Sequence, residues 1–343
     1  MVTGASTADA AVILIDATRL APDADGQVQL LPQTRRHAAL VHLLGLRHVV
    51  VAVNKMDAVG FASDVFESIV TAFDRLAKSL GLGDVTAIPM SALTGDNVVR
   101  RTSQMPWYRG PVLLDWLESV DIAPAGDSAA DTSIPLRFAV QWVQKRGARA
   151  DAGARAYLGR VGSGTVRSGQ EVRILPSGAR ARVAAIETFD GDLASAVAGK
   201  SVAIRLDREV DVSRGDWLVA VDEPSQPRLA RRVHADLAWL DAAPLEPQRK
   251  FLVRHGTRLT WARIVEIEAL LDLHAIRWRE ANDLRDTAAT LGPNDIARVV
   301  LEVQQPLPFD PYDRSVVSGA VVLIDATTNH TLAAGMLRAA VDA

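Results

Sequence analysis

The sequence of 343 residues contains no cysteine, which excludes disulfides and thiolate metal sites and is consistent with a reducing compartment. It also has no apolar run of roughly 18 residues, so no membrane-spanning helix is expected. The first residues, Met1 to Ser6, do not show a basic stretch followed by an apolar one, as a secretory leader would. Together these absences predict a cytoplasmic protein that has no membrane partner.

The sequence also lacks an excess of positive charge and a metal-binding motif. The formal net charge is −3, so the chain has no overall basic field that would attract nucleic acid. The seven histidines form no H-E-x-x-H pattern. His37 and His42 are five residues apart, which places them off a common helical face, so we expect no metal site.

The first third of the chain has the pattern of an α/β domain. Three short apolar runs, at residues 11–16, 48–53 and 85–90, are typical of parallel strands that are covered on both faces. Between them lie two segments of helical length, at residues 34–44 and 62–80. The second of these carries apolar residues at 3–4 spacing, which predicts one face turned towards a core.

The pattern changes after residues 121–133, a segment rich in alanine, aspartate, serine and glycine that we interpret as a linker. Beyond it, strand-like segments alternate with glycine-rich turns every 8–12 residues or so, as in a β-barrel or sandwich. Prolines at 224–227 suggest another boundary. We therefore predict three domains, at residues 1–125, 133–224 and 228–343.

One polar motif follows the central apolar run directly. Asn54-Lys55-Met56-Asp57 matches the N-K-x-D box that recognises guanine. The carboxylate of Asp57 can accept hydrogen bonds from the ring N–H and the amine of guanine, a pair of donors that adenine does not offer. Asn54 would bond the base edge and brace the phosphate loop, and the stem of Lys55 would lie over the ring. Alone, the motif fits a polar turn equally well.

A second loop makes the guanine interpretation stronger. About 35 residues later another apolar run ends in Ser91-Ala92-Leu93, where a backbone N–H can reach the guanine oxygen. Both loops follow the carboxyl ends of predicted parallel strands, the edge of an α/β sheet at which ligands bind. The predicted guanine-binding residues are Asn54, Lys55, Asp57, Ser91 and Ala92.

These motifs and their order resemble the translational GTPases. The segments that carry this resemblance are 32–37 (PQTRRH), 54–57, 91–93, 105–111 (MPWYRGP) and, for the second domain, 155–166. Three further stretches look like the GTPase subunit family of bacterial sulfate adenylyltransferase, namely 135–143, 188–192 and 311–320. The resemblance implies a multidomain α/β plus β protein, with a partial P-loop-type G domain of three parallel strands followed by two β-barrels of the elongation-factor type.

The resemblance also implies a function. In that family, a GTPase subunit pairs with a smaller catalytic subunit, as a heterodimer or a larger assembly. GTP hydrolysis, with Mg²⁺, drives the formation of adenosine 5'-phosphosulfate from ATP and sulfate in sulfate assimilation. A nucleic-acid partner is not implied.

Two motifs of a complete GTPase are missing from this sequence. There is no G-x-x-x-x-G-K-[ST] loop to hold phosphates, and Asp23-Ala24-Asp25-Gly26 follows the wrong strand to be the D-x-x-G switch. We therefore expect no catalytic residue, no retained GTP or Mg²⁺, and no hydrolysis. We also expect the G domain to be truncated at its amino end, with Met1 an internal methionine of a longer coding sequence. In such a domain the strand at 11–16 has an open apolar edge, so residues 1–120 are expected to be poorly stable alone.

Two alternatives remain open at this point. The chain could be a fragment of an elongation factor that binds aminoacyl-tRNA, although its acidic balance and Tyr312-Asp313-Arg314 argue against this. It could also be a docking scaffold that works without nucleotide. Pull-down of tRNA rather than of the smaller sulfate adenylyltransferase subunit would favour the elongation factor. Partner binding that does not depend on GTP would favour the scaffold.

Overall fold

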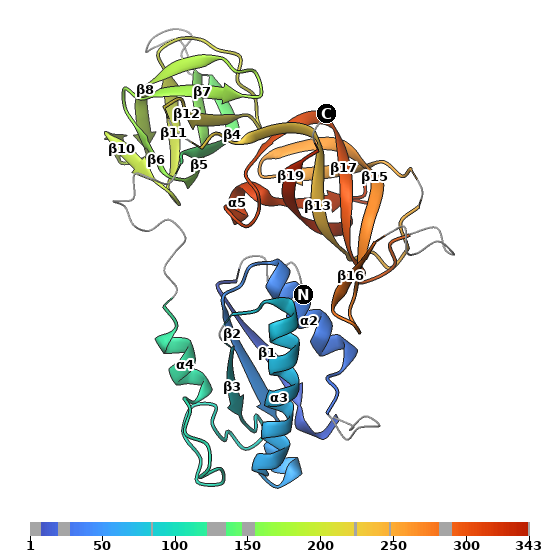
Figure 1. Cartoon of the computed structure of the whole chain (residues 1–343). Coiled ribbons are helices and arrows are strands. Elements are labelled where there is room, and N and C mark those ends of the chain that lie inside the picture. The colour runs from blue at the N-terminus through green and yellow to red at the C-terminus, as the bar shows by residue number, and fades with distance from the viewer. Residues whose placement is uncertain are drawn as a thin grey trace. The chain divides into compact units, whose positions relative to one another are not determined.

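The structure, a computed structural model, describes residues 8–19, 28–83, 85–121, 135–145, 155–222, 225–246, 248–280 and 290–341. The chain forms two compact units (Figure 1). The first comprises Met1–Ile122 and Leu271–Arg279, and the second comprises Ala123–Leu270 and Glu280–Ala343. The expected turn at residues 23–26 and nearly all of the expected linker lie outside the described residues. No helix in the described part of the chain is long and apolar enough to span a membrane.

The first unit is built on a three-stranded parallel sheet in the order β1-β2-β3. Its strands are β1 (Ala10–Asp16), β2 (His48–Asn54) and β3 (Val85–Pro89). In β2, residues 49–53 are all buried, as expected for a central strand of β-branched residues that is covered on both faces. The predicted three parallel strands are therefore confirmed.

Helices α2 (Pro32–Leu43) and α3 (Ser63–Leu80) pack on this sheet, and a shorter helix, α4 (Leu113–Ser119), follows β3 (Figure 1). Proline at the first position of α2 suits a helix start, since its missing N–H has no helical acceptor there. Helix α3 ends at Gly81, whose φ of 73° is the left-handed conformation that closes helices. Its buried stripe is Phe66, Ile69, Ala72, Phe73, Leu76 and Ala77.

Strand β1 differs from the expectation. We predicted that both of its faces would be covered, but Val12 is 45% exposed and Leu14 is 59% exposed. Ile13 and Ile15, on the opposite face, are buried in the core of the unit. β1 is an edge strand, as expected. The prediction was wrong for the face that carries Val12 and Leu14, because an apolar run does not reveal whether other elements cover both faces of a strand.

The second unit contains two closed antiparallel barrels, as the sequence predicted. In the first, the sheet order β11-β5-β4-β12-β7-β8 closes through pairing of β11 with β8. Its elements are β4 (Arg137–Lys145), β5 (Arg155–Ser163), β6 (Thr165–Arg167), β7 (Glu171–Leu175), β8 (Arg180–Thr188), β9 (Gly191–Leu193), β10 (Ser195–Val197), β11 (Ser201–Leu206) and β12 (Trp217–Ala220). Alternate residues of these strands, including Phe138, Tyr157 and Ile174, fill the interior.

In the second barrel the order β14-β18-β19-β13-β17-β15 closes through pairing of β14 with β15. Its elements are β13 (Arg228–Trp239), β14 (Phe251–His255), β15 (Arg258–Asp272), β16 (Arg277–Glu280), β17 (Ile296–Phe309), α5 (Val316–Gly319), β18 (Ala320–Ile324) and β19 (Thr331–Ala340). Trp239, Phe251 and Phe309 are fully buried among its core residues.

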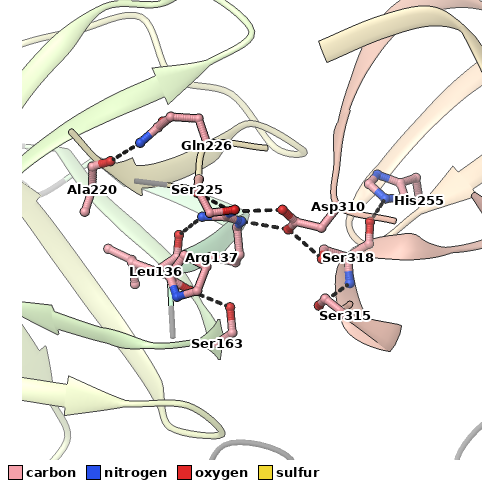
Figure 2. Close-up of polar contacts among 11 residues, drawn as sticks. Leu136, Arg137, Ser163, Ala220, Ser225, Gln226, His255, Asp310, Ser315 and Ser318 are labelled. Carbon is pink, nitrogen blue, oxygen red and sulfur yellow. Dashed lines mark hydrogen bonds and ion pairs between the residues drawn. The ribbon is translucent and has the colours of Figure 1, made fainter. Parts of the chain in front are cut away.

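A buried ion pair joins the two barrels (Figure 2). Arg137, which is 3% exposed, reaches both carboxylate oxygens of Asp310, with Nε to Oδ2 at 2.7 Å and Nη2 to Oδ1 at 2.9 Å. The hydroxyl of Ser318 also donates to Asp310, at 2.8 Å. A second pair, Arg258 Nη2 to Asp216 Oδ1 at 2.5 Å, joins the barrels in the opposite sense. Buried charges with this many partners fix the register of the contact.

Candidate guanine-recognition site

The N-K-x-D motif forms a tight turn at the end of β2. Lys55 has a φ of 65°, so the chain reverses there and continues into a short 3-10 helix, η2 (Met56–Val59). Met56 is fully buried, and its N–H donates to the carbonyl of Met90 at 3.2 Å. The N–H of Met90 donates in turn to Val53 at 2.8 Å. These bonds fasten the motif to the segment that follows β3.

The side chain of Asn54 joins the two loops that the sequence singled out. Its Oδ1 accepts a hydrogen bond from the N–H of Ala92 at 2.9 Å. The structure therefore brings together residues that are 38 positions apart in the sequence. In this arrangement the N–H of Ala92, which lies in the loop expected to offer a backbone N–H to the guanine oxygen, already has an acceptor.

Lys55 is held by a residue that the sequence analysis did not select. Its Nζ lies 2.7 Å from Oδ2 of Asp16, at the carboxyl end of β1. The hydrogen bond from Lys55 is the main reason that the pKa of Asp16 is lowered to about 2. Asp16 ends an apolar run in the same way as Asn54 does, and this shared position was the signal available in the sequence.

Among the five predicted guanine-binding residues, Asp57 has a buried side-chain oxygen without a hydrogen-bond partner. Its Oδ1 is buried, yet no donor reaches it from the described residues. A buried carboxylate oxygen without a partner is costly, and such atoms in folded proteins often mark the place of a missing ligand. Guanine would supply the ring N–H and the amine that this atom lacks.

Ser91 shapes the second loop from within. It is fully buried, its N–H donates to the carbonyl of Asp96 at 3.1 Å, and its hydroxyl accepts from the N–H of Thr94 at 3.3 Å. Asn97 is 1% exposed and ties the same loop to β3, since its Nδ2 donates to Pro89 at 3.0 Å. The loop is therefore pre-formed, and Ser91 holds its shape rather than presenting a free amide.

An aromatic cluster of Phe66, Trp107 and Tyr108 packs next to the segments that carry the two loops. The hydroxyl of Tyr108 lies 3.2 Å from the carbonyl of Ala87 in β3 and 2.9 Å from that of Pro111. Trp107 donates from Nε1 to Phe61, just after η2, at 3.1 Å. Burial raises the pKa of Tyr108 to about 12, so this hydroxyl stays protonated and can donate. From the sequence, residues 105–111 were noted only because they resemble the translational GTPases.

The described residues offer no group of three or more histidine, aspartate or glutamate side chains that could hold a metal ion. The candidate site consists of Asp16, the turn at residues 54–57 and the loop at residues 91–97, at the carboxyl ends of β1, β2 and β3.

Comparison with family models divides the chain into three matches. Residues 1–134 match the elongation factor Tu GTP binding domain, residues 155–219 match elongation factor Tu domain 2, and residues 232–338 match the GTP-eEF1A C-terminal domain-like family. Among solved structures, the chain is similar to sup35 complexed with GDP, with a TM-score of 0.54 and 24% identity, covering 100% of this chain and 81% of that one. At this identity the likeness shows the fold alone.

Similar proteins of known name are closer in sequence. The bifunctional enzyme CysN/CysC of Mycobacterium tuberculosis is 42% identical over 98% of this chain and 52% of its own length. Sulfate adenylyltransferase subunit 1 of Aliarcobacter butzleri is 38% identical over 98% of this chain and 66% of its own length. The same subunit of Bacteroides fragilis is 41% identical, with 98% and 65% covered.

The chain thus spans about half the length of the bifunctional relative and somewhat less than two thirds of the single subunits. The similarity nevertheless runs through all three matched regions of the chain. This chain belongs to the elongation-factor-Tu-type GTPases, in the family of sulfate adenylyltransferase subunit 1.

Proposed function

We propose that this chain works as part of the GTPase subunit of sulfate adenylyltransferase, and that the loops after β2 and β3 recognise guanine. The names of its relatives support the first statement. The unpartnered buried oxygen of Asp57 is the observation that carries the second. Asp57 accepts from the base, Asn54 braces the loop of Ala92, and Asp16 holds the ammonium of Lys55 in place.

The affinity of this site for guanine can be estimated from the free energies of its contacts. Charge-assisted hydrogen bonds contribute about 1.5–3 kcal/mol each, whereas association costs several kcal/mol of lost rigid-body freedom. The 343 residues contain no P-loop to hold phosphates. The remaining contacts supply about 4 kcal/mol at most, which corresponds to millimolar affinity. This stretch of chain therefore binds guanine weakly and hydrolyses no GTP.

Base recognition can be tested by comparing the binding of guanosine and adenosine. Addition of several millimolar guanosine should shift the backbone amide resonances of Asn54, Lys55 and Ala92, while adenosine at the same concentration should not. Asp57→Asn should abolish the guanosine shifts, because an NH₂ donor replaces one of the two acceptor oxygens and faces a donor of the base. Asp64→Asn, on the first turn of α3, serves as the matched control. Equal shifts with both nucleosides would contradict base recognition, and micromolar GTP affinity by calorimetry would contradict the weak site.

The partner in this proposal is the smaller catalytic subunit of the same enzyme. That subunit makes adenosine 5'-phosphosulfate and pyrophosphate from ATP and sulfate, and GTP hydrolysis by the complete GTPase subunit drives the reaction. The reaction takes place in the cytoplasm. Co-purification with the smaller subunit, without bound tRNA, supports this assignment, whereas retention of tRNA alone favours an elongation-factor role.

A further inference from the structure

A phenylalanine stands fully in solvent at the tip of one hairpin of the first barrel. Phe189 is 105% exposed, more than any other large apolar residue among the described residues. It lies between β8 and β9, where Thr188 pairs with Gly191, so that Phe189 and Asp190 form the whole loop. Burying a phenylalanine side chain contributes about 2–3 kcal/mol, and here that contribution is not used within the fold.

The hairpin beneath this side chain is well held. The hydroxyl of Thr188 donates to the carbonyl of Gly191 at 3.0 Å, and Gly191 adopts a φ of 124°, which favours glycine. Glu187, one residue before Thr188, is 9% exposed and forms an ion pair with Arg205 on the neighbouring β11 at 2.6 Å. Phe189 is therefore presented on a fixed support.

Local turn chemistry does not explain a phenylalanine at this position. Tight hairpin loops favour glycine, asparagine, aspartate and serine, because these residues tolerate or stabilise the turn backbone. Asp190 and Gly191 meet that preference, and Phe189 does not. A rigid, exposed aromatic side chain loses little conformational entropy on binding, which is why such residues often dominate the energetics of protein interfaces.

The charges around Phe189 restrict what it can bind. Asp190 and Asp192 follow it in the hairpin, both are exposed, and neither forms an ion pair with any of the described residues. Two carboxylates repel nucleic-acid phosphates and anionic membranes. They suit instead a protein surface that offers an apolar pocket bordered by lysine or arginine.

We infer that the tip of the β8–β9 hairpin docks the smaller catalytic subunit of sulfate adenylyltransferase, with Phe189 in an apolar pocket and Asp190 and Asp192 facing basic residues at its rim. This inference rests on the proposed function for the identity of the partner. It adds the element that makes the contact, a hairpin of the first barrel.

Binding of the chain to the smaller subunit from the same organism, measured by calorimetry, tests the inference. Phe189→Ala should raise the Kd at least tenfold and leave the thermal unfolding midpoint unchanged, since the side chain is fully exposed. The matched control is Trp261→Ala in the second barrel, where the tryptophan is 45% exposed; its Kd should stay within twofold. Asp190→Lys with Asp192→Lys should raise the Kd and weaken its dependence on salt.

The binding results distinguish a failure of the hairpin contact from a failure of the proposed function. If the unsubstituted chain binds and Phe189→Ala binds equally well, the hairpin contact is overturned and the proposed function stands. If the unsubstituted chain does not bind the subunit at all, both are overturned. Loss of tRNA binding on Phe189→Ala would also overturn the inference, in favour of base stacking.

Discussion

At the scale of single residues, the candidate site depends on groups packed behind it. Tyr108 supports β3 through its hydroxyl, and it has room only because position 110 lacks a side chain. A Cβ added at Gly110 would lie 2.3 Å from the Tyr108 hydroxyl and 2.6 Å from the ring carbon that bears it. Arg101 closes the same turn, since its Nη2 donates to the carbonyl of Gly110 at 2.6 Å. The turn therefore has little freedom to adjust.

Gly110→Ala should consequently displace Tyr108 and destabilise the first unit by about 1–3 kcal/mol, the usual cost of overpacking. Urea denaturation followed by tryptophan fluorescence measures the loss. Gly83→Ala is the matched control, because a Cβ there meets no atom within 4 Å. Equal stability of the two variants would show that Tyr108 does not depend on the space at Gly110.

A buried histidine gives the second unit a pH dependence. His255 is fully buried, stacks on Trp217 with ring centroids 5.5 Å apart, and donates from Nε2 to the carbonyl of Ser318 at 2.8 Å. Desolvation is the main cause that lowers its pKa from an ordinary 6.5 to about 4, and the positive charge of Arg258 adds to it, while Asp310 opposes it. The folded protein therefore keeps this ring neutral under mildly acidic conditions.

Between pH 6.5 and pH 4 the unfolded chain takes up a proton at this histidine and the folded chain does not. Stability is therefore complete above pH 6.5 and falls as the pH drops towards 4, by up to about 3 kcal/mol. Thermal unfolding at pH 7, 6 and 5 should show this decline. His255→Phe should flatten it, whereas His330→Gln, at an exposed position, should not. An unchanged pH profile in His255→Phe would contradict the assignment.

At the scale of elements, β1 shows what happens when a strand with the composition of a core strand lies at an edge. Val12 and Leu14 share a face with Val50 and Ala52 of β2, which are fully buried. The pair on β1 remains exposed. Exposed apolar residues on an edge strand favour association with other chains.

Leu14→Lys should therefore reduce self-association of the chain and leave its unfolding free energy within about 0.5 kcal/mol, as is usual for exposed positions. Static light scattering as a function of concentration measures the first effect. Ile13→Lys, whose side chain is buried on the opposite face, should instead unfold the first unit. If Leu14→Lys associates as strongly as the unsubstituted chain, this face of β1 does not mediate self-association.

At the scale of the whole molecule, the two barrels act as one unit, and the G-domain part forms another. Arg137 and Asp310 are 173 positions apart in the sequence, yet they share a buried bidentate contact between the barrels. Breaking one partner of such a pair costs several kcal/mol, since the other charge is left buried. The barrels should therefore resist unfolding and proteolysis together.

Limited proteolysis should first cut between residues 121 and 134 and yield a resistant fragment that begins near Ser133 and contains both barrels. Arg137→Ala should make that fragment cleavable between its barrels, near residues 222–228. Mass spectrometry of the time course identifies the cut sites. Uniform protection of the whole chain, or early cutting between the barrels of the unsubstituted protein, would contradict this division.

Much of the fold was determined by local sequence patterns. The valine-rich run before Asn54 predicted a buried parallel strand, and the 3–4 spacing from Phe66 to Leu76 predicted helix α3 and its buried face. The glycine-rich turns predicted barrel strands. These features depend on neighbouring residues and on the periods of strand and helix, so the sequence alone specifies them. The N-K-x-D motif likewise predicted, from the sequence alone, the turn after β2 that we propose recognises guanine.

The tertiary structure alone decided which distant groups meet. Nothing local links Lys55 to Asp16, Asn54 to the N–H of Ala92, or Arg137 to Asp310, because each contact depends on strand order and register. The exposure of Val12 and Leu14 has the same origin, since composition gives the character of a strand but not which of its faces other elements cover. Residue types determine what a segment can form, and packing between segments determines which of its groups stay free to bind.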